Sequence, residues 1–168
     1  MKTTLMLCSG ICFALGSLLH FAWGWLGKPR WLAPLMPVNE SVWEHTKLLI
    51  LPAIGLAPLE ARLLGLPTEQ VLGAVLPAVG AGAGAMVLFY YFWVGAIGPH
   101  GLLVGIGDFA LSVAVCFRVT RLLLERGVGL PCPGPALGIL MAGLILLTYY
   151  PPRLPIFQCG VTGRYGAE

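Results

Sequence analysis

Five apolar stretches, most of them as long as a membrane-spanning helix, are the feature that most constrains how this chain can fold. A helix needs about 20 apolar residues to cross the hydrocarbon core of a bilayer. Turns that contain glycine or proline separate the stretches, and these residues end or interrupt helices. We therefore predict five helices, at about residues 4–26, 41–64, 69–96, 100–125 and 136–150, followed by a tail over residues 151–168.

The composition agrees with lipid as the surroundings of these helices. Hydrophobic residues make up 58% of the 168 residues and charged residues only 10%, well below the roughly 25% of a typical soluble domain. We predict a single-domain, all-α membrane protein, a bundle of five transmembrane helices that passes several times through the cell membrane, with the lipid bilayer as its partner. The net charge of +3 forms no basic arm or cluster, so we expect no nucleic acid partner.

Two proline-containing segments flank the predicted helices at one end of the bundle. The linker from Lys28 to Val38 is rich in proline and apolar residues, which favours an interfacial or re-entrant segment before the second helix over a free loop. Pro151 and Pro152 end the fifth predicted helix. The apolar Phe157 that follows them predicts a tail folded back over the aromatic end of the bundle.

The densest group of polar residues lies at the start of the second predicted helix. Residues 37–47 read Pro-Val-Asn-Glu-Ser-Val-Trp-Glu-His-Thr-Lys, and polar groups at membrane depth are costly unless they pair or perform a task. A capping box from Ser41 to Glu44 is the simple structural explanation, but it leaves Glu40 and His45 without a role. We therefore interpret Glu40, Glu44 and His45 as candidate catalytic residues, with Glu44 or Glu40 as the general base.

Histidines at the same end of the bundle form a candidate metal site. Neutral imidazoles, together with nearby carboxylates, suit a hard or borderline divalent metal. The spacing matches no recognised motif such as HExxH, so the sequence leaves open whether a metal is the cofactor. A hydrogen bond that fastens the first two helices together explains His20 equally well. The candidate ligands are His20, His45 and His100.

Further polar and aromatic residues at this end are candidates to bind a substrate. Asp108 lies about two turns inside an apolar helix, and Gly101 and Gly105 near its face would let a ligand or another helix approach. Tryptophans and tyrosines also collect at this end rather than at both interfaces, where aromatic belts normally form. The candidate substrate-binding residues are Asn39, Trp43, Lys47, Tyr90, Asp108 and Tyr150.

Three classes of function fit these residues. The first is a membrane-embedded hydrolase or transferase that acts, with or without a metal, on a small-molecule or lipid-like ligand. The second is a small transporter or a proton or cation pathway that uses Asp108 and the polar cluster. The third is a structural membrane subunit whose polar groups hold the helices together.

Three segments together resemble a known family. These are Ser17-Leu-Leu-His-Phe21, the stretch from Pro37 to Lys47, and a tail that contains Tyr150-Pro-Pro-Arg-Leu-Pro-Ile-Phe157 and Val161-Thr-Gly-Arg-Tyr-Gly166. They resemble DUF6512, a family of small prokaryotic multi-pass proteins of unknown function. The resemblance implies a prokaryotic plasma membrane location and places the three segments on one side. It implies no activity.

Overall fold

The fold comes from a computed structural model, which describes residues 1–167. The five helices are α1 (Lys2–Trp25), α2 (Val42–Leu64), α3 (Thr68–Ala96), α4 (Leu102–Glu125) and α5 (Pro133–Tyr149), with two short 3-10 helices, η1 (Arg30–Leu35) and η2 (Pro155–Phe157). The only β-type pairing among the described residues is a single bridge between Gln158 and Tyr165. The all-helical prediction is confirmed, and the observed helix ends lie close to the predicted ones.

Three of the helices, α1, α3 and α4, are long and apolar enough to cross a membrane. The other two differ from them in opposite ways. Helix α2 carries Glu44, Lys47, Glu60 and Arg62, and α5 is apolar but has only 17 residues. The three apolar helices support a membrane location, whereas the crossing of all five helices stays a prediction.

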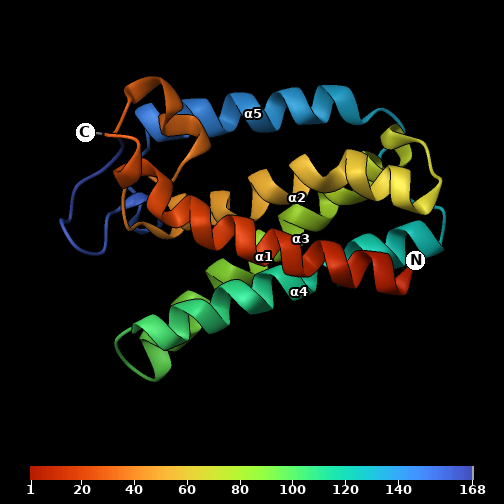
Figure 1. Cartoon of the computed structure of the whole chain (residues 1–168). Helices are drawn as coiled ribbons and strands as arrows, with labels where there is room; N and C mark the ends of the chain where they lie inside the picture. The colour runs from red at the N-terminus through yellow and green to blue at the C-terminus, as the bar shows by residue number, and fades with distance from the viewer. Residues whose placement is uncertain (168) are drawn as a thin grey trace.

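Successive helices run in opposite directions along the bundle, so that the two chain ends lie at opposite ends of the molecule (Figure 1). Helix α3 packs most extensively against α4 and then against α2, and α1 packs against α2 and α4. Helix α5 lies on the side away from α4, where it contacts α3 and η1. The core therefore lies among α1 to α4, and α5 covers one side of it.

Two glycines allow this close packing. A Cβ at Gly16 of α1 would collide with the Leu48 carbonyl of α2 and with the Phe109 ring of α4. A Cβ at Gly82 of α3 would lie 2.6 Å from the Leu49 side chain and 2.8 Å from the Ser112 carbonyl. Gly16 thus lets α1 approach both α2 and α4, and Gly82 lets α3 approach the same two helices.

The segment before α2 and the carboxyl-terminal tail meet at one end of the bundle (Figure 1). Phe157 of η2 is buried and packs against Trp43, with ring centroids 5.3 Å apart. The Gly160 amide donates a hydrogen bond to the Glu40 carbonyl at 3.0 Å. The tail therefore folds back onto the start of α2, as the apolar residue after the two prolines predicts.

Candidate functional site

The turn that leads into α2 is held by side chains of its own polar stretch. Ser41 is the N-cap of α2, and its hydroxyl accepts a hydrogen bond from the Glu44 amide at 3.3 Å. The Asn39 side-chain oxygen accepts one from the Ser41 amide at 2.9 Å, and its side-chain nitrogen donates to the Gly166 carbonyl at 3.1 Å. These bonds satisfy the helix terminus and fix Glu40 between the start of α2 and the tail.

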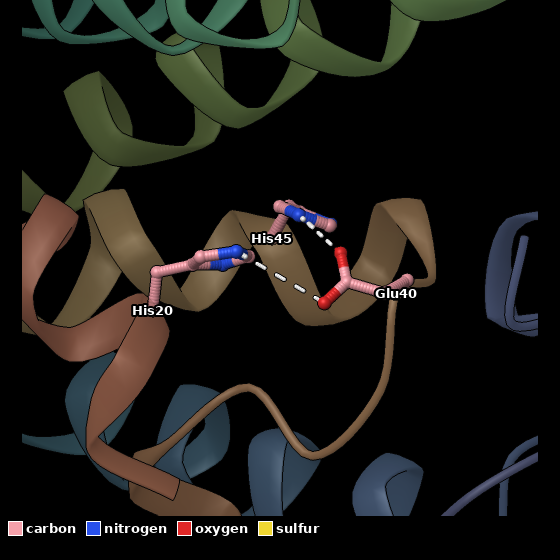
Figure 2. A group of neighbouring side chains, drawn as sticks. All are labelled: His20, Glu40 and His45. Atoms are coloured by element: carbon pink, nitrogen blue, oxygen red, sulfur yellow. Dashed lines mark ion pairs between the residues drawn. The ribbon is translucent and has the colours of Figure 1, made fainter. Parts of the chain in front are cut away.

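Glu40 lies between two imidazoles (Figure 2). One carboxylate oxygen is 3.3 Å from Nε2 of His45, and the other is 4.0 Å from Nε2 of His20. One potential ligand atom from each residue lies within 4.8 Å of the other two, an arrangement that could hold a metal ion. Two histidines and a carboxylate are also the protein ligands of some catalytic zinc and iron sites. We call His20, Glu40 and His45 the triad.

The tautomer of His45 follows from its second contact. Its Nδ1 lies 2.8 Å from the Ser41 carbonyl, which can only accept, so Nδ1 carries a proton and donates it. The Nε2 atom that faces Glu40 is then either free to bind a metal or protonated as part of an imidazolium. Histidines that bind metals are commonly oriented in this way, by an Nδ1–H bond to a backbone carbonyl.

Glu40 is charged at neutral pH. The hydrogen bond from His45 lowers the pKa of Glu40 against the opposing effect of burial, and the nearby charges of His45 and His20 lower it further. The side chain is 49% exposed, so water reaches it. The triad therefore presents an ionised carboxylate, which is the form that binds metal ions.

A cavity of about 720 Å³ adjoins the triad, a volume within the range of about 300–1,000 Å³ that is usual for ligand pockets. All three triad residues line it, and Tyr90, His100 and Asp108 contribute further polar groups. Most of the remaining lining is apolar, and α1 and α4 contribute more of it than α2 and α3 do. The cavity thus brings together six of the residues that the sequence analysis selected.

His100 and Asp108 form a second polar pair in the cavity. His100 Nε2 lies 3.8 Å from Asp108 Oδ2, and the His100 ring packs against Tyr90 with centroids 4.8 Å apart. A Cβ at Gly105 would lie 3.3 Å from the same ring, so the glycine makes room for it. In the described part of the chain, His100 Nε2 and Asp108 Oδ1 are buried without a hydrogen-bond partner. Both atoms therefore lack the hydrogen-bond partner that a buried polar atom usually has.

Glu44 and Lys47 lie outside the cavity, in a buried ion pair. Lys47 Nζ is 2.7 Å from Glu44 Oε2, and it donates to the Thr148 hydroxyl at 2.6 Å. It also donates to the carbonyls of Ala33 at 3.1 Å and Met36 at 3.3 Å. These contacts tie α2 to α5 and to η1. The structure does not bring these two residues to the triad, and His20 meets Glu40 and His45 rather than Glu44.

Three other predicted substrate-binding residues do not line the cavity. Asn39 holds the tail, Trp43 packs against Phe157, and Tyr150 is 78% exposed. Of the six predicted substrate-binding residues, only Tyr90 and Asp108 line the cavity. The binding and catalytic roles assigned to all these residues stay predictions.

Glu60 is a polar residue that the sequence analysis passed over. It is fully buried in α2, and neither carboxylate oxygen has a hydrogen-bond partner among residues 1–167. The available signal was a carboxylate between Leu59 and Ala61, inside an apolar stretch and without a charged residue one turn before it. A buried carboxylate without a partner is expensive, so such a residue usually has a task.

The comparison with protein families agrees with the resemblance seen in the sequence. Residues 1–167 match DUF6512, which is described as a family of unknown function. The chain belongs to DUF6512. No curated protein and no solved structure matches it. Membership in DUF6512 brings no activity with it, so a function for this chain has to be argued from the site.

Proposed function

We propose that this member of DUF6512 is a membrane-embedded, metal-dependent hydrolase or transferase, with a divalent metal held by His20, Glu40 and His45. The observation that carries the proposal is the approach of three ligand atoms to within 4.8 Å at the wall of a large cavity. Three protein ligands leave a coordination position open, as in catalytic rather than structural zinc sites. A metal in this position supplies a Lewis acid that polarises a carbonyl or phosphoryl oxygen.

The geometry of the triad supports this assignment. Two ligand atoms bound to one tetrahedral zinc at about 2.0–2.1 Å lie roughly 3.3 Å apart. The separation between His45 Nε2 and one Glu40 oxygen is 3.3 Å, which matches this value, and that between His20 Nε2 and the other oxygen is 4.0 Å, so His20 would have to move closer to join the same ion. His100 pairs with Asp108 instead of joining the triad. We therefore assign Glu40 to the metal and leave Asp108 as the carboxylate that exchanges protons with the ligand.

The proposal includes a plasma membrane location in which α2 and α5 also cross the bilayer. Three of the four charged side chains of α2, those of Glu44, Lys47 and Glu60, are buried inside the bundle, where neighbouring helices shield them from lipid. Arg62 lies in the last turn of α2, close enough to the helix end to reach the interface. The charges that make α2 less apolar are thus compatible with a span in the middle of the bundle.

Metal analysis of purified protein tests the proposed site. We expect one zinc or other first-row divalent ion for each chain. Replacing His20 or His45 by Ala, or Glu40 by Gln, should lower the affinity by more than the roughly 10–100-fold typical of a residue that only hydrogen-bonds to a metal ligand. The control is Glu125→Gln, because Glu125 pairs with Arg121 far along α4 and has no part in the triad.

The His100→Ala variant distinguishes a metal site formed by the triad from one formed by the three histidines. If the metal stays bound when His100 is replaced, the triad is the site. If the wild-type protein binds no metal in stoichiometric amount, or if the triad variants bind it as well as Glu125→Gln does, the metal centre is wrong.

A proton pathway is a second candidate function, and the buried Glu60 is the observation that favours it. A carboxylate of this kind within a membrane bundle is a common element of proton routes. The test is proton flux into liposomes that contain the wild-type protein or the Glu60→Gln variant. Flux that depends on Glu60 supports a pathway, whereas equal flux in both samples and in empty liposomes excludes this role.

A further inference from the structure

The mouth of the cavity is apolar and exposed. Phe21 of α1 and Leu102 and Ile106 of α4 all line the cavity, and their exposed fractions are 56%, 80% and 48%. Helices α1 and α4 pack beside each other and are two of the three helices that are both long and apolar enough to cross a membrane. In the proposed membrane setting these side chains face hydrocarbon, so the open side of the cavity faces lipid rather than water.

The tail covers the cavity on another side. Gly160 and Val161 line the cavity, and the Gly160 amide is bonded to the Glu40 carbonyl next to the triad. The tail also borders a second, smaller cavity of about 350 Å³, which shares Tyr90, Val94 and Gly160 with the first. The tail thus covers part of the polar end of the large cavity, while the exposed apolar residues of α1 and α4 border an opening on the side that faces lipid.

The charges around the cavity restrict the headgroup that fits it. Two carboxylates, Glu40 and Asp108, line it, but among the described residues no lysine or arginine does. Lys47 is committed to the buried pair with Glu44. A divalent metal in the triad would only balance the two carboxylates, so an anionic headgroup gains no net attraction. In contrast, the unpaired Asp108 Oδ1 needs a hydrogen-bond donor.

We infer that the cavity binds a single-chain lipid whose headgroup is uncharged or cationic and carries a hydroxyl or amine donor. Asp108 accepts the hydrogen bond of this donor, the polar end lies towards the triad, and the chain leaves between α1 and α4 into the bilayer. The cavity volume suits one headgroup with the beginning of one chain. The inference rests on the proposed function for the membrane setting and for the chemistry at the polar end.

Native mass spectrometry of the full chain in detergent tests the inference, with defined lipids added. The probes share an unsaturated or long single chain and differ in the headgroup: monooleoylglycerol is neutral, sphingosine is a cationic amino alcohol, and oleoyl lysophosphatidic acid is anionic. We expect the first two to be retained at concentrations at least about tenfold lower than the third, since the phosphate of the third would lie beside the Glu40 and Asp108 carboxylates with no lysine or arginine in the described lining to neutralise it.

Two variants locate the binding site. Ile106→Trp fills the mouth and should weaken retention of the neutral and cationic lipids about tenfold or more. The matched control is Ile145→Trp on α5, because Ile145 is 47% exposed, like Ile106 at 48%, but lies away from the cavity. Asp108→Asn removes the charge and should weaken sphingosine more than monooleoylglycerol.

Metal content is measured on the same samples, so the metal centre and the lipid site are tested separately. Lipid retention with this headgroup preference in a protein that binds no metal would support the inference and contradict the metal centre. A metal-loaded protein that retains the anionic lipid equally well, or that is blocked equally by Ile106→Trp and Ile145→Trp, would overturn the inference and leave the metal centre standing.

Discussion

Lys47 is completely buried, and its ammonium group contacts four oxygen atoms from different parts of the chain. Replacing it by Met would leave the Glu44 carboxylate buried without its cation. We expect Lys47→Met to destabilise the fold by about 3–5 kcal/mol, whereas the double variant with Glu44→Gln should recover much of this loss, because the unpaired charge is gone. Thermal unfolding in detergent measures both.

Arg121→Met is the control for this comparison. Arg121 and Glu125 form a partly exposed pair one turn apart, and such a pair contributes at most about 1 kcal/mol. If Lys47→Met costs no more than Arg121→Met, the buried pair is not what joins α2 to α5.

Glu40 leads to a pH prediction. Because its pKa is lowered in the folded protein, the interaction with His45 stabilises the fold above the usual carboxyl range and is lost as the pH falls through the lowered pKa. We expect the metal-free wild type to be more stable than Glu40→Gln at neutral pH, and the two melting temperatures to converge in acid. The difference should be small because Glu40 is half exposed. A difference that does not change with pH would contradict the ion pair.

The sequence predicted the neighbourhood of the site but not every role within it. The clustering of polar residues at 37–47 and the isolated Asp108 pointed to the end of the bundle at which the triad and the cavity lie. The sequence could not show which of the two carboxylates, Glu40 or Glu44, faces the histidines, because both lie near the start of one helix. The direction of each side chain depends on contacts far along the chain, such as the bond from Lys47 to Thr148.

Among the elements, the tail gives the clearest prediction. Phe157 anchors it against Trp43, and burial of a phenylalanine is typically worth about 3–5 kcal/mol relative to alanine. We expect the amides of Cys159 and Gly160, which donate hydrogen bonds to Arg164 and Glu40, to be protected from exchange in the wild type. Phe157→Ala should remove that protection and leave the amides of α3 protected.

Tyr150→Ala serves as the control for the tail, because Tyr150 is largely exposed and its loss should change little. Fast exchange at Cys159 and Gly160 in the wild type would show that the tail does not cover the cavity.

The helices were predictable at this scale because their signals are local. Long apolar runs show where the helices lie, and glycine and proline residues mark where they end. Ser41 caps the start of α2. The 3-10 helix η1 was not predictable as such. Lys47 donates hydrogen bonds to the carbonyl of Ala33 in η1 and to that of Met36 directly after it, and the Arg30 carbonyl accepts a hydrogen bond from Tyr149. These are tertiary contacts that no local pattern contains.

For the whole molecule, the prediction concerns topology. The two chain ends lie at opposite ends of the bundle (Figure 1). Four of the five native cysteines are buried and only Cys132 is exposed, so Cys132→Ser gives a background of low reactivity. Single cysteines introduced at Lys2 and at Ala167 should then react with a membrane-impermeant reagent from opposite sides. Labelling of both from the same side would contradict five crossings.

The hydrogen bonds at the start of α2 also determine when the site can form during synthesis. Asn39 is bonded to a residue 127 positions later, and Lys47 to one 101 positions later. At about 5–20 residues per second, the ribosome needs roughly 6–25 s to reach the partner of Asn39. Throughout that interval the nascent chain carries a charged pair and a polar turn without most of their partners. The cavity is therefore completed last, and a chain that stalls before its final residues displays these unsatisfied groups to the proteases and chaperones of the membrane.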